Sequence, residues 1–80
     1  MDKIEKALKD EGAENIEGYM LINNYGYTFD LKGNRYDARF WANCYGAALD
    51  YWEVMDMKNG YTNDAMMLTS LLNKVDGCTK

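Results

Sequence analysis

The segment Trp41–Met57, WANCYGAALDYWEVMDM, carries both tryptophans of the chain, and the rest of the protein is expected to pack around it. Its large and apolar residues recur at alternating steps of four and three. They are Trp41, Tyr45, Ala48, Trp52 and Met55. This spacing predicts an α-helix with one apolar face. Because a buried tryptophan ring hides roughly 150–250 Å², that face is expected to lie against the rest of the chain.

The sequence just before this segment, residues 27–40 (YTFDLKGNRYDARF), has the pattern of a β-hairpin. With Gly33 and Asn34 as the two central turn residues, the cross-strand pairs on one face are all apolar. These pairs are Leu31/Tyr36, Phe29/Ala38 and Tyr27/Phe40. The other face carries the pairs Asp30/Asp37 and Thr28/Arg39, with Asp30 beside Arg35 and Arg39, and Asp37 beside Lys32. A slip by one residue would mix the two faces, so the pattern predicts this register.

Three more elements are predicted outside the hairpin and the tryptophan segment. Residues 2–11 form a short helix that Gly12 ends. The apolar run Tyr19–Ile22 has the length of a strand whose faces are well covered. Thr62 is the expected N-cap of a last helix, which closes near Gly77. The apolar face of this helix consists of Met67, Leu68, Leu71, Leu72 and Val75.

Together these elements predict a single small α+β domain that spans residues 1–80. It contains a short N-terminal helix, a three-stranded and mostly antiparallel sheet with the hairpin turn at Gly33-Asn34, and two C-terminal helices packed on one sheet face. A chain of 80 residues hides only about 60% of its unfolded surface. Self-association as a homodimer is therefore a further hypothesis.

Composition and charge narrow the function classes. Apolar residues make up 48% of the chain and both signs of charge are present, which is typical of a folded protein. The net charge of −4 opposes direct binding to nucleic acid or to anionic lipid, and it favours a basic protein surface as partner. The sequence shows no secretory signal, no membrane-spanning run and no disulfide framework. We therefore expect a cytoplasmic protein that makes no membrane contact.

The chain contains no histidine, which excludes Ser-His and Cys-His nucleophiles and histidine-ligated metals. Two cysteines cannot supply the four ligands of a structural zinc site. Asp30 and Asp37 could act as paired carboxylates or hold magnesium, but the cations beside them favour a neutralised surface network. We expect no catalytic residue, no metal and no cofactor, and we rank an enzyme last among the function classes.

The first functional hypothesis is a small acidic protein-interaction module. Its partner-binding residues are Asp50, Glu53 and Asp56 on the exposed side of the predicted tryptophan helix, flanked by Val54 and Met57. The partner is a basic protein that handles nucleic acid. Small acidic proteins encoded by phages and other mobile elements often inhibit host nucleases or defence complexes in this way, and this chain is similar to them in size and charge alone.

The alternative hypothesis is a protein that binds a nucleotide or another planar small molecule. Tyrosine and tryptophan rings, with Tyr25 as the first candidate, would stack on the ligand. Arg35 or Arg39 would then bind its anionic group.

Overall fold

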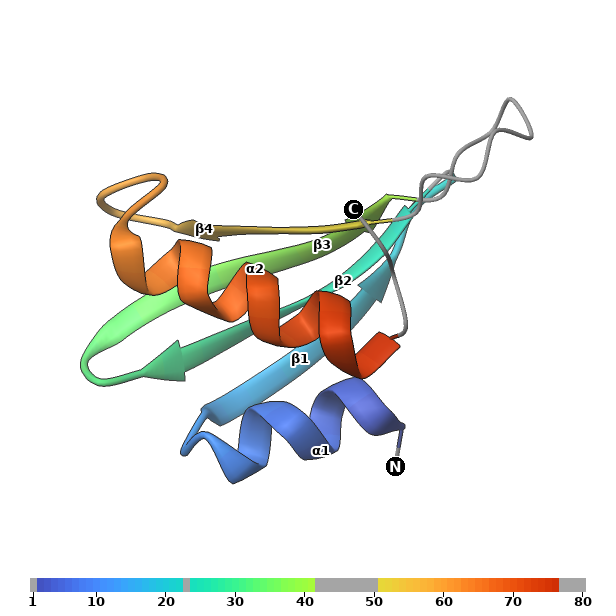
Figure 1. The fold of residues 1–80 in the computed structure, drawn as a ribbon, viewed down its shortest axis with the longest axis horizontal. Coiled ribbons are helices and arrows are strands. Elements are labelled where there is room, and N and C mark those ends of the chain that lie inside the picture. Colours follow the sequence, from blue (N-terminus) through green and yellow to red (C-terminus); the bar gives the residue numbers. More distant parts are fainter. Residues whose placement is uncertain (1, 23, 42–50, 77–80) are drawn as a thin grey trace.

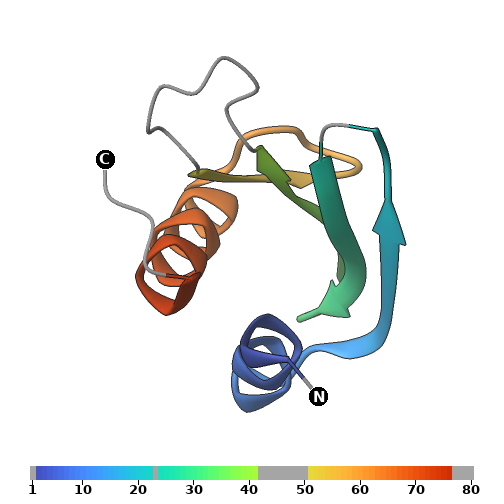
Figure 2. The same cartoon turned by 90° about the vertical axis from the view of Figure 1, so that its right-hand side faces the viewer.

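The computed structural model describes residues 2–22, 24–41 and 51–76. The elements follow the order α1 (Lys3–Asp10), β1 (Glu14–Met20), β2 (Asn24–Leu31), β3 (Asn34–Trp41), β4 (Tyr51–Asp56) and α2 (Asn63–Asp76). The strands form one antiparallel sheet in the order β1-β2-β3-β4. Both helices lie on the same side of this sheet, which curves around them (Figure 1 and Figure 2). The prediction of an α+β fold is thus confirmed.

Helix α1 begins and ends within one residue of the predicted limits, 2 and 11, which are its two cap residues. The Asp2 Oδ1 atom accepts a hydrogen bond from the Glu5 N–H at 2.8 Å and so caps the first turn. Gly12 has a φ of +96°, the left-handed conformation that commonly follows the end of a helix. Ile4 and Leu8, one turn apart, are both buried against the rest of the core.

The core lies between the helices and one face of the sheet. Its largest fully buried side chains are Phe29 from β2, Tyr36 from β3 and Trp52 from β4. The rings of Phe29 and Tyr36 stack with their centroids 5.6 Å apart. Ala65, Leu68 and Leu72 of α2 complete this core together with the buried residues of α1.

The β2–β3 hairpin turns at Lys32-Gly33, and the predicted turn at Gly33-Asn34 is wrong. Lys32 has a φ of +52° and Gly33 a φ of +82°, as a two-residue hairpin turn of type I′ requires. In the observed register Phe29 faces Tyr36, so each residue meets a partner two positions away from the predicted one. Because side chains alternate with a period of two, the predicted apolar and polar faces are nevertheless retained.

The helix predicted over Trp41–Met57 is wrong wherever the structure describes that segment. Trp41 is the last residue of β3, and the later part of the segment forms β4. The central part of the predicted helix, residues 42–50, lies outside the described residues. The fold therefore has a fourth strand in place of the first of the two C-terminal helices.

In β4 the burial alternates as it does in a strand with one covered face. Trp52 and Val54 are buried in the core, whereas Glu53 between them lies on the other face. Trp52 is therefore buried as predicted. Trp41, which the predicted helix placed on the same face as Trp52, lies on the opposite side of the sheet, because its cross-strand partner is Tyr51.

Strand β1 starts at Glu14, earlier than the predicted run at Tyr19, and it is not well covered. Met20, Leu21 and Ile22 are 84%, 52% and 98% exposed. Met20 ends β1, which forms an edge of the sheet, and Leu21 and Ile22 follow the strand, so none of the three is covered by a neighbouring strand on that side.

Helix α2 follows the prediction closely. The Thr62 Oγ1 atom accepts a hydrogen bond from the Ala65 N–H at 3.2 Å, which confirms the predicted N-cap. Leu68 and Leu72 are buried, and Leu71 and Val75 are partly buried. Met67 is 71% exposed, so its predicted burial is wrong. The predicted end near Gly77 lies beyond the described residues.

Side chains of α2 cover the outer edge of β4. The Trp52 N–H donates to Asn73 Oδ1 at 2.8 Å, and the Val54 N–H donates to Thr69 Oγ1 at 3.0 Å. Thr69 and Asn73 stand one helical turn apart and so face the same edge. Two outward backbone N–H groups of this edge are therefore already bonded, so the edge is less able to pair with another strand.

Candidate functional site

The sheet face opposite the helices, here called the open face, gathers charged and aromatic side chains. Residues directly opposite in an antiparallel pair share a face, so the register identifies its members. They are Glu14, Glu17 and Tyr19 of β1, Thr28 and Asp30 of β2, Arg35, Asp37, Arg39 and Trp41 of β3, and Tyr51, Glu53 and Met55 of β4. Five of these are acidic and two are basic, which leaves three negative charges. Neither α1 nor α2 lies on this face (Figure 2).

Arg35 is held by several acceptors at one end of the open face. Its Nη2 atom donates to Glu17 Oε1 at 2.8 Å and to Thr28 Oγ1 at 2.9 Å. Its Nη1 atom donates to Asp30 Oδ1 at 3.2 Å, which confirms the predicted proximity of these two residues. Hydrogen bonds from Asn15 and Arg35 keep the pKa of Asp30 below its ordinary value.

Arg39 belongs to a second cluster, in which three side chains bond to one another. Tyr19 Oη donates to Asp37 Oδ1 at 2.7 Å, and Arg39 donates from Nε to Tyr19 Oη and from Nη2 to Asp37 Oδ2, both at 3.2 Å. Burial raises the pKa of Tyr19, so the phenol stays protonated and can donate. Asp37 was predicted beside Lys32. In the observed register Asp37 faces Thr28 and is not diagonal to Lys32, and its carboxylate bonds instead to Arg39, two residues along the same strand.

Gly26 makes room for this second cluster. A Cβ atom at position 26 would lie 2.6 Å from Tyr19 Oη and 2.4 Å from the carbonyl oxygen of Ala38. The Tyr19 ring can therefore cross over β2 toward Arg39 only because residue 26 has no side chain.

Trp41 and Glu53 extend the network toward β4. Trp41 Nε1 donates to Glu53 Oε2 at 3.2 Å, and Tyr61 Oη donates to Glu53 Oε1 at 2.5 Å. The bond to Glu53 raises the pKa of Tyr61. The Arg39 guanidinium carbon lies 5.7 Å from the centre of the Trp41 ring, which is the geometry of a cation–π contact. These contacts join Glu53 of β4 to the Arg39 cluster.

The structure does not bring the predicted partner-binding residues together on one surface. Glu53 lies on the open face, but Val54 is 1% exposed and Asp56 is 2% exposed. The Asp56 carboxylate accepts hydrogen bonds from the backbone of the turn that follows β4. Met57 is exposed beyond the end of that strand, and Asp50 lies outside the described residues. The difference arises because a strand sends successive side chains to opposite faces, whereas a helix would have gathered them.

The structure does not bring the alternative ligand-binding residues together either. Tyr25 lies on the core side of the sheet, where its ring centroid is 5.0 Å from that of Phe40 and 5.7 Å from that of Trp52. Arg35 and Arg39 lie on the open face and are bonded to carboxylates. A single planar ligand therefore cannot contact these three residues at once.

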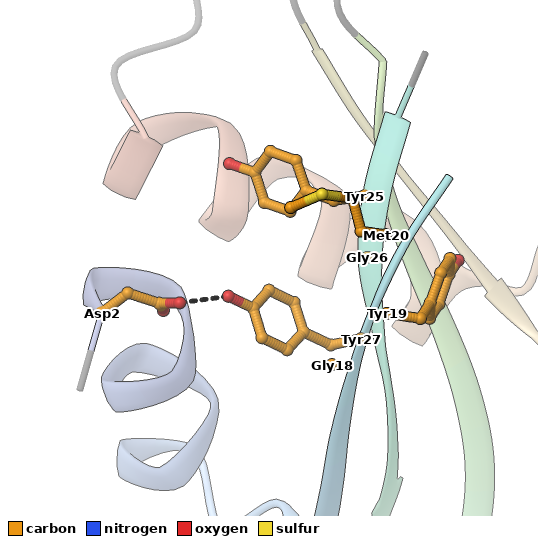
Figure 3. A pocket seen from close by; sticks show the side chains of 7 residues that line it. All are labelled: Asp2, Gly18, Tyr19, Met20, Tyr25, Gly26 and Tyr27. Atoms are coloured by element: carbon orange, nitrogen blue, oxygen red, sulfur yellow. Dashed lines mark hydrogen bonds between the residues drawn. The ribbon is translucent and has the colours of Figure 1, made fainter. Parts of the chain in front are cut away.

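A separate pocket of about 540 Å³ lies on the helix side of β1, at the edge of the sheet (Figure 3). The rings of Tyr25 and Tyr27 and the side chain of Met20 line it, and Asp2 of the α1 cap stands at its far end. Tyr27 Oη donates a hydrogen bond to the Asp2 carboxylate. Gly18 also lines the pocket and leaves the Tyr27 ring uncovered there, because a Cβ atom at position 18 would lie 3.5 Å from that ring.

Across residues 2–22, 24–41 and 51–76, no group of three or more Cys, Asp or Glu side chains is arranged to hold a metal ion. In the same segments, neither helix combines the length and the apolar character that a bilayer crossing requires.

The sequence did not predict the open face, because its pattern predicts a strand at Tyr19–Ile22 that is covered on both faces and a helix over the residues of β4. Two signals for it were present. Glu17 and Tyr19 alternate with Gly18 and Met20, the period of a strand with two different faces. Gly26 interrupts an otherwise good strand sequence, which is typical of a close approach by another group. Comparisons with protein-family models, with curated proteins and with solved structures find no match to this chain.

Proposed function

We propose that the protein is a small acidic protein-interaction module of the cytoplasm and that its open face binds the basic surface of a partner protein. The observation that carries the proposal is the charge of this face. Its two arginines are already paired with its own acids, and three negative charges remain. The whole chain has a charge of −4, so most of its excess charge gathers on one face.

Aromatic side chains support binding by the same face. Trp41 and Tyr19 lie among the acids, and aromatic rings are enriched at protein interfaces because they bury a large area with few rotatable bonds. Their polar atoms are bonded to Glu53 and Asp37, so both rings are fixed before a partner arrives. Such pre-organisation lowers the entropy lost on binding.

The partner class follows from charge complementarity. A protein that binds nucleic acid presents lysines and arginines to phosphates, and the same side chains can be attracted by a face of carboxylates. The proposed partner is therefore a basic protein that handles nucleic acid, and we place it in a host cell because this chain is similar in size and charge to small acidic inhibitors encoded by phages. Binding would inhibit this partner, because the open face and the nucleic acid compete for the same basic surface of the partner.

The test is affinity capture from the native cell with three matched baits. The wild-type chain is compared with Glu17→Gln/Glu53→Gln on the open face and with Asp10→Asn/Glu11→Gln, which removes the same charge from the exposed end of α1. A basic protein should be retained by the wild type and by the α1 variant, and be lost from the open-face variant. It should elute as salt rises from about 50 mM to about 500 mM, since screening weakens exposed charge pairs. Equal retention by all three baits would contradict the proposal.

A further inference from the structure

The two edges of the sheet differ in how they are protected. Side chains of α2 bond to the outward N–H groups of Trp52 and Val54 at the β4 edge. Neither described helix lies along the outer edge of β1 (Figure 1 and Figure 2). If a further strand joins this sheet, β1 is the edge that can accept it.

The backbone of β1 points hydrogen-bonding groups outward at Gly18 and Met20. The Leu21 N–H donates to the Asn24 carbonyl oxygen at 2.7 Å, so the backbone groups of Leu21 face β2. In an antiparallel pair the bonded residues alternate, so the groups of Tyr19 also face β2. The N–H and C=O groups of Gly18 and Met20 therefore face away from the sheet and can pair with another extended segment.

The residues next to the β1 edge favour particular side chains in such a segment. An added strand would place alternate side chains on the two faces of the sheet. On the helix side they would enter the pocket lined by Tyr25 and Tyr27, which takes a bulky apolar side chain or the stem of a long basic one (Figure 3). On the open face they would come next to the exposed acids Glu14 and Glu17, which attract lysine or arginine.

We propose that an extended segment of a basic partner protein adds to β1 as a fifth strand, with alternating basic and apolar side chains. This inference deepens the proposed function and rests on it, because the same acidic face would recruit the partner. A second copy of the chain fits the edge less well. Each copy carries a charge of −4, and pairing two β1 strands would bring their acids together.

A fluorescent eight-residue peptide of alternating lysine and valine is the probe, and anisotropy measures its affinity. Met20→Pro removes the outward N–H at position 20 and leaves the β1–β2 bonds in place. Met20→Ala is the matched control, because it shortens the side chain and keeps the N–H. The proposal predicts that Met20→Pro binds the peptide about tenfold or more weakly than Met20→Ala, because both variants lack the Met20 side chain that lines the pocket and only Met20→Ala keeps the N–H.

A second arm leaves the protein unchanged and so does not depend on the folding of a variant. Methylation of alternate backbone nitrogens in the peptide should weaken its binding to the wild type by a similar factor. Hydrogen exchange should show that the Gly18 and Met20 amides gain protection when the unmethylated peptide binds. Equal binding by Met20→Pro and wild type, protection at β4 instead of β1, or a wild-type dimer that the peptide cannot dissociate would overturn the proposal.

The two proposals can fail separately. Suppose that capture of a basic protein requires Glu17 and Glu53, and that this protein binds Met20→Pro and wild type with equal affinity. The open face then binds the partner without strand addition. Suppose instead that the peptide protects the β1 amides from hydrogen exchange and that capture does not require Glu17 and Glu53. The strand-addition site is then supported, and the proposed function of the open face is contradicted.

Discussion

Replacing Thr69 by valine tests how the β4 edge is closed. Thr69 Oγ1 accepts the Val54 N–H at 3.0 Å and donates to the Ala65 carbonyl oxygen at 3.0 Å. Valine has nearly the same shape and is also branched at Cβ, so it removes the acceptor with little change in packing or helix propensity. Because Val54 is 1% exposed, its N–H is left in the interior without the acceptor it has in the wild type.

An unsatisfied buried donor costs about 1–3 kcal/mol. A domain of this length has a free energy of unfolding of about 4–12 kcal/mol, so the loss is a substantial fraction of the total. For such a domain each kcal/mol lowers Tm by about 4–8 °C. Urea and thermal unfolding should therefore show Thr69→Val clearly below the wild type, and the Val54 amide should lose protection against hydrogen exchange.

Thr69→Ser is the matched control, because serine keeps the hydroxyl and loses one methyl group. Thr69→Ser should lower the free energy of unfolding less than Thr69→Val does, although it removes more packing area. The assignment of Thr69 as the edge cap would be refuted if Thr69→Val were as stable as the wild type, or if Thr69→Ser were the less stable of the two.

Three further changes probe the fold and its response to pH. Gly26→Ala places a Cβ atom 2.4 Å from the carbonyl oxygen of Ala38, so it should lower the free energy of unfolding by about 1–3 kcal/mol in urea titrations. Phe29→Ala, at a fully buried position, should cost about 3–5 kcal/mol by the same measurement, whereas Met67→Ala at an exposed position should be nearly neutral. Hydrogen bonds from the turn backbone lower the pKa of Asp56 below its ordinary 3.8. The ionised carboxylate therefore stabilises the folded protein above pH 3.8, and this stabilisation is lost as the pH falls through the lowered pKa. Asp56→Asn should therefore reduce the fall in Tm between about pH 5 and pH 2, and an unchanged pH profile would contradict this role for Asp56.

The parts of the fold that could be predicted are those in which one local signal is decisive. Asp2 and Gly12 mark the limits of α1, and Thr62 marks the start of α2, because caps act within one turn of the chain. The two faces of the hairpin were also predictable. Their period of two survives a register error of two residues.

The remaining parts depend on competition between local signals. Trp41 and Trp52 have helical spacing, but Tyr51–Asp56 also alternates with the period of a strand, and pairing with β3 decides in favour of the strand. The two-residue turn could start at Lys32 or at Gly33, since only the strand register distinguishes them. The candidate site was missed for the same reason, because residues of the open face come together only when four strands are aligned.

Carboxyl footprinting of the complex with the captured basic protein tests whether the open face is the binding surface. Carbodiimide coupling of a small amine followed by mass spectrometry measures the reactivity of each acid in the free and bound chain. Glu17 and Glu53 should become less reactive on binding, whereas the reactivity of Asp10 and Glu11 at the end of α1 should not change. Protection of Asp10 and Glu11, with Glu17 and Glu53 as reactive as in the free chain, would contradict binding by the open face.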